Sequence, residues 1–318
     1  MRLFPRQDYD RVVFVYDTNV LPISFDICWA LAWADLQTSR LGRNRFDVVI
    51  IMPCLLFRHS KPEDDPDYVS RHELIWRVHQ ILVPLAAMYR ATGALTTISS
   101  EDWPSARHKL TRCGHVLAPT NLTTIYRETL AGERPPSGFT APPGTIDALQ
   151  DLAGHSFNDR VISITIRESR GGAARNSDLV EWTRFGEVIA GEGFLPVFVP
   201  DTDRWYVPTS LPGLTLPMAS LNMSARVALY ESATLNMFVN SGPASICYLS
   251  PDFSYIMFKI LAAGERLSSI EVLNELGFRE GEGVPFASER QKWVWESDRF
   301  EVILREFRRM LAVGANIS

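Results

Sequence analysis

Near-continuous hydrophobic runs alternate with amphipathic stretches in the first half of the chain. Residues 11–17 and 46–52 are almost wholly apolar, which is typical of strands covered on both faces in a parallel sheet. Residues 26–38 between them show helical spacing, and Asp26 is placed to cap that helix. The strand–helix–strand order predicts a βαβ unit and hence an α/β fold.

The pattern continues with a longer amphipathic stretch. Apolar residues recur at helical spacing from Ser70 to about Thr92, and Gly93 is placed to end that helix. Residues 96–100 then form a short strand candidate.

The second half of the chain repeats this rhythm, with apolar runs followed by amphipathic stretches. The predicted strands are 161–166, 194–199 and 237–240, and the predicted helices are 177–190, 226–235, 269–276 and 297–311.

A Pro- and Gly-rich segment separates the two halves. Residues 132–144 hold four prolines and three glycines, a composition typical of a linker. A chain of 318 residues is about twice the usual single-domain length. We therefore predict an α/β protein of two Rossmann-like, doubly wound lobes, residues 1–140 and 141–318, with a cleft between them.

Composition narrows the class of partner and the compartment. The net charge of −5 argues against a general nucleic-acid binder, because such proteins need a basic surface. The four cysteines are scattered and fit neither a zinc site nor a disulfide framework. The N-terminus lacks the apolar core of a signal peptide, and no apolar run is long enough to span a bilayer. These features predict a cytoplasmic protein whose membrane contact, if any, is peripheral.

Open parallel sheets bind their ligands beyond the carboxyl ends of the strands. After the predicted strand 161–166 come Arg167, Arg170 and Arg175, with two glycines, before the Asn176–Ser177 start of a helix. Arginines fork onto phosphate oxygens, and glycines let the backbone approach them. This segment predicts a diphosphate-binding loop. The alternative is a solvated basic loop in which Asn176 or Ser177 only caps the helix.

Two further strand ends carry candidate residues. Asn240, Ser241, Gly242 and Pro243 form a tight turn between a strand and a helix; its N–H groups would bind an anion, or the turn merely caps the helix. Asp201 follows the strand 194–199, where a carboxylate would bond ribose hydroxyls or simply shape a turn.

The first half offers a candidate general base between Asp17 and Asp26, where a carboxylate facing the cleft would deprotonate an acceptor hydroxyl. The acidic run Asp64, Asp65 and Asp67 is flanked by prolines and reads as a solvated loop rather than a metal site. Dehydrogenase, P-loop, zincin and hydrolase motifs are all missing from the sequence. We predict neither a metal nor a cofactor.

The second half resembles the donor-binding domain of GT-B-fold glycosyltransferases, especially the heptosyltransferase and fucosyltransferase branches. The resemblance rests on the strand leading to Arg167, the helix start at Asn176, the strand end at Asp201, and the helix 228–233 that leads into Gly242–Pro243. Heptosyltransferases carry Asp-Thr-Gly-Pro where this chain reads Asn-Ser-Gly-Pro.

This resemblance implies a metal-independent glycosyltransferase that moves a sugar from a nucleotide-diphosphate donor to an unknown acceptor. Residues 141–318 would bind the donor and residues 1–140 the acceptor. The implied site residues are Arg167 and Arg175 with Asn176 at the diphosphate, Asn240, Ser241, Gly242 and Pro243 beside it, Asp201 or Glu231 near the nucleoside, and Asp26 as base. The alternatives are a sugar-nucleotide epimerase of the same architecture and a non-catalytic relative that binds a nucleotide-sugar or a partner protein.

Overall fold

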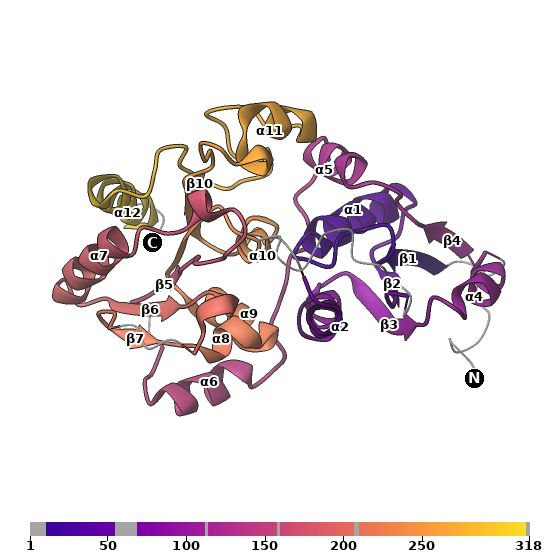
Figure 1. Ribbon diagram of the computed structural model, residues 1–318, viewed down its shortest axis with the longest axis horizontal. Coiled ribbons are helices and arrows are strands. Elements are labelled where there is room, and N and C mark those ends of the chain that lie inside the picture. Colours follow the sequence, from indigo (N-terminus) through magenta and orange to yellow (C-terminus); the bar gives the residue numbers. More distant parts are fainter. Residues whose placement is uncertain (1–10, 55–68, 112–113, 158–159, 207–209, 316–318) are drawn as a thin grey trace. The chain divides into compact units, whose positions relative to one another are not determined.

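The chain forms two compact units, Met1–Phe139 (unit 1) and Thr140–Ser318 (unit 2). The computed structural model describes residues 11–54, 69–111, 114–157, 160–206 and 210–315 (Figure 1). The division between the units falls inside the Pro- and Gly-rich segment 132–144. The acidic run Asp64, Asp65 and Asp67 lies outside the described residues.

Unit 1 is built on a four-stranded parallel sheet with the strand order β3-β2-β1-β4. Its elements are β1 (Arg11–Asp17), α1 (Ile27–Arg40), β2 (Phe46–Ile51), α2 (Arg71–Arg77), a π-helical turn (Val78–Leu82), α3 (Val83–Met88), β3 (Thr92–Ile98), α4 (Trp103–Leu110), β4 (Gly114–Leu117) and α5 (Leu122–Leu130).

The central strand β1 is apolar throughout because both of its faces are covered. Val13 and Val15 pack in one core cluster with residues of α4, whereas the ring of Phe14 faces the other way and lies 6.3 Å from that of Trp33 on α1. Most of α1 is itself buried, so this helix lacks the polar face that usually marks a surface helix.

The predicted long helix from Ser70 to Thr92 is wrong at its C-terminal end. The helical segment stops at Met88, and Thr92 already begins β3. Gly93 therefore lies inside a strand and does not end a helix. A Cβ on Gly93 would lie only 2.7 Å from Oδ1 of Asp47, so the glycine serves a close approach between β3 and β2.

Unit 2 is built on a six-stranded sheet with the order β10-β9-β8-β5-β6-β7, again parallel throughout. Its elements are α6 (Thr145–Ala153), β5 (Val161–Thr165), the 3₁₀ turn η2 (Ala173–Arg175), α7 (Leu179–Gly191), β6 (Leu195–Val199), η3 (Thr202–Arg204), β7 (Leu214–Thr215), α8 (Met218–Leu221), α9 (Met223–Ser232), β8 (Leu235–Val239), α10 (Ala244–Tyr248), β9 (Tyr255–Phe258), η4 (Arg266–Ser268), α11 (Ile270–Leu276), β10 (Gln291–Trp293) and α12 (Phe300–Ala315).

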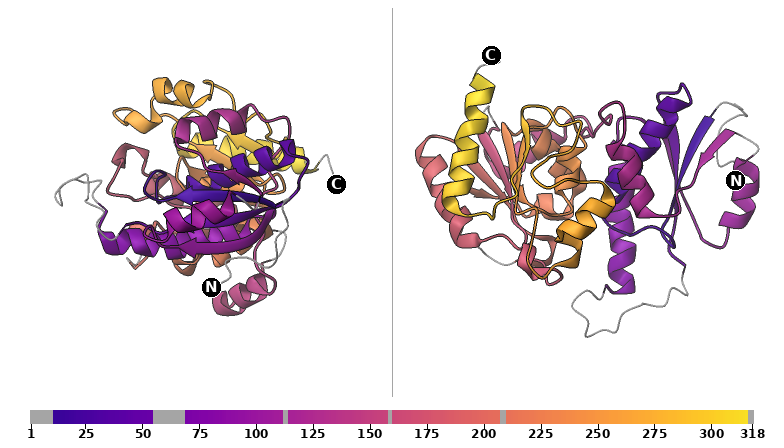
Figure 2. Two further views of the ribbon diagram at one scale, coloured as in Figure 1. Left: turned by 90° about the vertical axis from the view of Figure 1, so that its right-hand side faces the viewer. Right: turned by 90° about the horizontal axis from the view of Figure 1, so that it is seen from above.

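Helices cover both faces of the unit 2 sheet. Ile162 and Ile164 pack against α7 and α12 through a cluster that includes Trp182 and Phe307. The opposite face, which includes Val161, packs against α6 and α9. Figure 2 shows α12, in yellow, alongside this sheet. The period-two alternation along β5 thus divides its side chains between two cores.

The predicted α/β class with parallel sheets is confirmed in both units. The short strands β4, β7, β9 and β10 were not among the predicted elements, because runs of two to four residues carry little periodicity. Within the described parts of the chain, no helix is both long and apolar enough to cross a bilayer.

Candidate functional site

The carboxyl edge of the unit 2 sheet contains a topological switch point. From β5 the chain moves outward through β6 to β7, then returns to the other side of β5 and continues through β8, β9 and β10. In doubly wound sheets, ligands bind where the order reverses in this way. Here the reversal lies between the ends of β5 and β8, which lead into Arg167 and Asn240.

Arg167 organises the loop that follows β5, residues 167–177, which we call the arginine loop. Its Nη1 donates to the carbonyl of Gly172 at 2.9 Å and to Oδ1 of Asn176, and its Nη2 donates to the carbonyl of Gly171 at 2.6 Å. The side chain is buried. Arg167 therefore shapes the loop from within, rather than reaching out of it as the sequence suggested.

Arg175, at the end of η2, is the second guanidinium of this loop. It lies against Gly172, where an added Cβ would come within 2.7 Å of its Nη2. Its Nε is buried and has no hydrogen-bond partner among the residues that the structure describes. Burial lowers the pKa of Arg167, and the charge of Arg175 lowers it further, against the opposing effect of Asp201. Two positive charges thus lie close together in a partly desolvated place, where an anion would stabilise both.

The side chain of Asn176 cross-links the arginine loop through three hydrogen bonds. Its Oδ1 accepts from Arg167 and from the N–H of Ser169, and its Nδ2 donates to the carbonyl of Ser169. The predicted alternative, that Asn176 or Ser177 caps the next helix, is wrong, because Asp178 caps α7 through the N–H groups of Val180 and Glu181.

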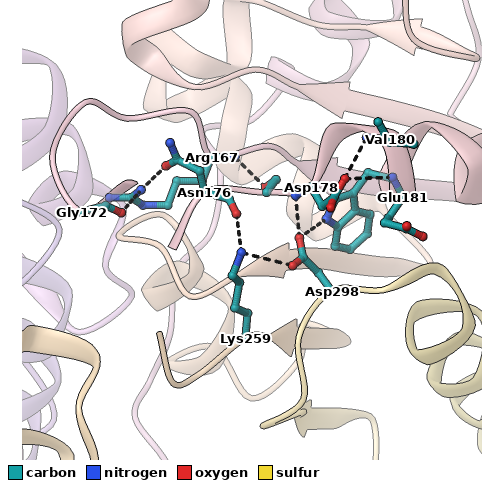
Figure 3. Close-up of polar contacts among 10 residues, drawn as sticks. Arg167, Gly172, Asn176, Asp178, Val180, Glu181, Lys259 and Asp298 are labelled. Atoms are coloured by element: carbon teal, nitrogen blue, oxygen red, sulfur yellow. Dashed lines mark hydrogen bonds and ion pairs between the residues drawn. The ribbon is translucent and has the colours of Figure 1, made fainter. Parts of the chain in front are cut away.

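Lys259, directly after β9, and Asp298, shortly before α12, support the arginine loop, and the sequence did not single them out. Nζ of Lys259 donates to the carbonyl of Asn176 at 2.7 Å and lies 3.4 Å from Oδ1 of Asp298. The other carboxylate oxygen of Asp298 accepts from the N–H of Asp178 and from the indole of Trp182 (Figure 3). The only available signal was a lysine directly after an apolar run, which is too common to be informative.

The backbone of Lys259 is also unusual. Its φ of 56° is the one positive value at a non-glycine residue in the described chain. Such a conformation is maintained only where the surroundings hold it, and here the anchors are Asn176 and Asp298. The lysine thus fixes the position of the arginine loop.

Asp201 joins the ends of β5 and β6. Its Oδ2 accepts from the N–H of Glu168 at 3.0 Å, and its Oδ1 accepts from the N–H of Asp203 at 3.0 Å as the cap of η3. Both oxygens therefore shape turns, which was the alternative reading of this residue.

The turn of Asn240, Ser241, Gly242 and Pro243 follows β8. The N–H groups of Ala244 and Ser245 donate within the turn, and Nδ2 of Asn240 donates to the carbonyl of Ile260. The exception is Ser241, which is only 8% exposed. Its hydroxyl has no hydrogen-bond partner within the described residues. A buried hydroxyl without a partner costs free energy that a ligand oxygen would recover.

Glu231 lies on α9 and holds the start of unit 2. Its carboxylate accepts from the hydroxyl of Thr140 at 2.8 Å and from the N–H of Ala141 at 3.0 Å. The structure therefore brings Arg167, Arg175, Asn176 and Asp201 together, with Asn240 and its turn on the neighbouring strand, but gives Glu231 a connecting role.

In unit 1, Asp26 stands directly before α1. It is the N-cap residue of α1, as predicted, but its side chain makes no cap hydrogen bond to the helix. Its Oδ1 accepts from the hydroxyl of Tyr126 at 2.8 Å, and its Oδ2 accepts from that of Ser24 at 2.6 Å. Two hydroxyl donors hold this carboxylate in one orientation.

Metal ligands do not gather in the described part of the chain, where no group of three His, Cys, Asp or Glu side chains is placed to hold an ion. The chemistry that the described residues offer at the unit 2 edge is the two arginines with hydroxyl and amide groups, and the carboxylates of Asp201, Glu265 and Asp203 lie near enough to act on Arg167.

The fold and this site can be set against known proteins. No protein-family model matches the chain, and no curated protein matches its sequence. Its structure is similar to that of the glycosyl transferase family 9 from Veillonella parvula DSM 2008, with a TM-score of 0.54 and 10% identity over 97% of this chain and 99% of that one. It is also similar to the E. coli ADP-heptose lps heptosyltransferase II, with a TM-score of 0.55 and 10% identity over 96% of this chain and 99% of that one.

These comparisons establish a shared fold along almost the full length of the chain. The predicted likeness to heptosyltransferases is thereby confirmed at the level of fold. The likeness to fucosyltransferases stays a prediction.

Proposed function

We propose that this chain is a metal-independent glycosyltransferase of the GT-B type, which takes a sugar from a nucleotide-diphosphate donor. Unit 2 binds the donor at the carboxyl edge of its sheet, and unit 1 recognises the acceptor. The fold shared with two glycosyltransferases supports the class, and the arginine loop supports the diphosphate.

The observation that carries the proposal is the pair of guanidinium groups at the switch point. Burial lowers the pKa of Arg167, the charge of Arg175 lowers it further, and the carboxylates of Asp201, Glu265 and Asp203 oppose this change. Repulsion between the two guanidinium groups is thus one cost of keeping both of them charged. A diphosphate between the strand ends reverses that cost by charge-assisted hydrogen bonds. Arg167 is already engaged by its own loop, and Arg175 is therefore the residue that contacts the phosphate.

The same pair would assist the chemical step. Transfer forms a bond from the acceptor oxygen to the anomeric carbon and breaks the bond from that carbon to the donor phosphate. Negative charge grows on the departing diphosphate, where positive side chains stabilise it most. In this proposal Asp26 accepts the proton of the acceptor hydroxyl, while Tyr126 and Ser24 orient its carboxylate.

The comparisons supply a first candidate for the donor nucleotide. One of the similar structures is an ADP-heptose heptosyltransferase, so an ADP-sugar is the first donor to test. The arginine loop itself recognises the diphosphate, which ADP-, GDP- and UDP-sugars share.

A thermal-shift screen of the purified chain against ADP, GDP, UDP, CMP and their sugar conjugates tests the proposal. A ligand at 100 times its dissociation constant stabilises the folded state by about 2.7 kcal/mol. We expect a selective shift with one diphosphate nucleotide. The absence of a shift with every nucleotide would contradict the proposal and favour a partner-binding role for the fold.

The same donor separates the two alternative functions. Conversion of the nucleotide-sugar to an isomer without an acceptor would show an epimerase. Binding without hydrolysis, transfer or isomerisation would show a non-catalytic relative.

A further inference from the structure

Two exposed aromatic residues follow strand β6. Trp205 and Tyr206 are 42% and 67% exposed, and they are the only aromatic residues among the strongly exposed large hydrophobic side chains of the described chain. Their rings lie 5.8 Å apart at an interplanar angle of 81°. Single exposed hydrophobic residues are common on proteins, but adjacent, contacting aromatic rings more often mark a binding surface.

This aromatic pair shares an anchor with the arginine loop. Asp201 accepts from Glu168, at the start of that loop, and from Asp203, in the turn η3 that leads directly to Trp205. The negative charge of Asp203 also acts on Arg167, where it opposes the lowering of the pKa. The aromatic pair therefore begins one short turn away from the residues of the anion site.

The next strand adds one more exposed apolar side chain to this edge. Met218, at the start of α8, is 40% exposed. The two loops are tied together, because the hydroxyl of Ser220 donates to the carbonyl of Pro200 at 2.6 Å and that of Thr202 donates to the carbonyl of Ser220 at 3.3 Å. Exposed apolar side chains thus appear along the carboxyl edge after β6 and β7, beyond the charged residues Asp201, Asp203 and Arg204 that follow β6 directly.

The spacing of these features suits one kind of ligand. Neighbouring strands lie about 4.8 Å apart, so the ends of β6 and β7 lie roughly 5 and 10 Å from the end of β5 along the sheet. A nucleoside diphosphate joins an anionic group to a flat aromatic ring through a single ribose. Its phosphates would meet Arg175, and its base would then reach the loops after β6 and β7.

We propose that Trp205 and Tyr206 form a stacking platform for the nucleobase of the donor. This inference rests on the proposed function, since it assumes that the diphosphate lies at the arginine loop. Stacking tolerates every base, because each has a π-face. The platform therefore adds affinity for nucleotides as a class, and the identity of the base must be read by other contacts.

The test compares two ligands that differ by the nucleoside. The intact protein and a Trp205→Ala, Tyr206→Ala double variant are titrated calorimetrically with inorganic pyrophosphate and with the nucleoside diphosphate that gave the largest thermal shift. Loss of base stacking predicts a nucleotide affinity lower by roughly 5- to 150-fold, with pyrophosphate affinity unchanged. The melting temperature should stay the same, because both side chains are exposed.

Two further variants sharpen the result. Trp205→Phe keeps an aromatic face and should retain most of the nucleotide affinity, although the nucleotide will no longer quench the fluorescence of residue 205. Leu152→Ala is the matched control, since Leu152 is also 67% exposed but lies on α6, ahead of β5. It should bind both ligands normally.

The outcomes distinguish the platform from the function on which it rests. Unchanged nucleotide affinity in the double variant, or an equal loss for both ligands, overturns the platform and leaves the diphosphate site standing. Failure of the intact protein to bind either ligand overturns the proposed function, and the platform with it.

Discussion

The two units wind their sheets in the same way but end their first strands differently. Unit 1 has the order β3-β2-β1-β4, and unit 2 repeats it as β7-β6-β5-β8 before adding β9 and β10. Each first strand is therefore central, with the switch point beside it. In unit 2 that strand leads into the arginine loop, whereas in unit 1 it ends at Asp17.

The residues after β1 form a hydrogen-bonded network that, among the residues the structure describes, includes Asp17, Asn19, Ser100 and Cys54. Oδ1 of Asp17 accepts from both nitrogens of Asn19, and the side chain of Asn19 bonds Ser100 and the N–H of Cys54. These contacts join the segments that follow β1, β2 and β3 at the carboxyl edge of the unit 1 sheet. The winding of a sheet therefore sets where a ligand would lie, and the residues just beyond the strand set which charge that ligand would carry.

The largest effect expected is on turnover, through unit 1. Asp26→Asn keeps the size and the hydrogen-bonding reach of the side chain but removes the base. If Asp26 deprotonates the acceptor, release of nucleotide from the donor should slow by about 10²- to 10⁴-fold, with donor affinity unchanged.

Tyr126→Phe is the companion variant for this test. It removes only one of the two hydroxyls that orient Asp26, so the loss of turnover should be smaller. Undiminished turnover in Asp26→Asn would show that Asp26 is not the general base.

The next effect concerns stability and compares one buried aspartate from each unit. Asp298 in unit 2 and Asp35 in unit 1 are both buried. Asp298 holds Lys259 and the start of α7, and Asp35 holds Tyr89, Ser137 and Arg134. Replacing either aspartate by alanine leaves buried donors unpaired and should cost about 3 kcal/mol of unfolding free energy, as measured by denaturant unfolding.

Nucleotide binding should then distinguish these two variants. Asp298→Ala releases Lys259 from one of its two partners and so loosens the arginine loop, which should weaken nucleotide binding. Asp35→Ala should bind normally at temperatures where it is folded. Equal binding by both variants would mean that the loop keeps its shape without the Lys259–Asp298 pair.

A more local effect is expected from the arginine pair. Arg175→Ala removes a charge-assisted contact worth about 1.5 to 3 kcal/mol, so nucleotide and pyrophosphate affinity should both fall by roughly 10- to 150-fold. Arg308→Ala is the matched control, because it removes the same charge at Glu192, just after the C-terminus of α7 and hence at the opposite edge of the sheet. Similar losses in the two variants would indicate a general charge effect.

Gly172→Ala should act in the same direction but less strongly. Gly172 has a φ of 64°, a conformation that costs other residues about 1 to 2 kcal/mol. The added methyl group would also displace the guanidinium of Arg175. We expect an affinity loss of about tenfold by calorimetry, and full retention of affinity would show that Arg175 does not act from its position over Gly172.

The smallest effect is expected at Glu231, where the structure departs most from the sequence prediction. Glu231→Gln weakens the attachment of Thr140 and Ala141, neither of which belongs to the arginine loop. Nucleotide affinity should change by less than about twofold. A large loss of nucleotide affinity would instead support the predicted position of Glu231 near the nucleoside.

The sequence by itself determined the class of the fold and the main strand ends. The apolar runs of β1, β2, β5 and β6 are long enough to be recognised, and they predicted parallel sheets that the structure confirms. The placement of Arg167, Asn176 and Asp201 beyond those ends followed from the same runs. Local pattern suffices here because strands covered on both faces must be apolar along their length.

Only the tertiary structure decided what each of these side chains does. Arg167 turned inward onto Gly172 because of the path of its own loop, which apolar periodicity does not specify. Asp201 bonds Glu168 and Glu231 bonds Thr140, and these partners lie far away in the sequence. Lys259 and Asp298 were missed because the ion pair joins residues that the turn η4, the helix α11 and the strand β10 separate along the chain. Hydrogen bonds and ion pairs require donor and acceptor to be placed to within a few tenths of an ångström. Only the folded chain places residues from distant segments with that precision.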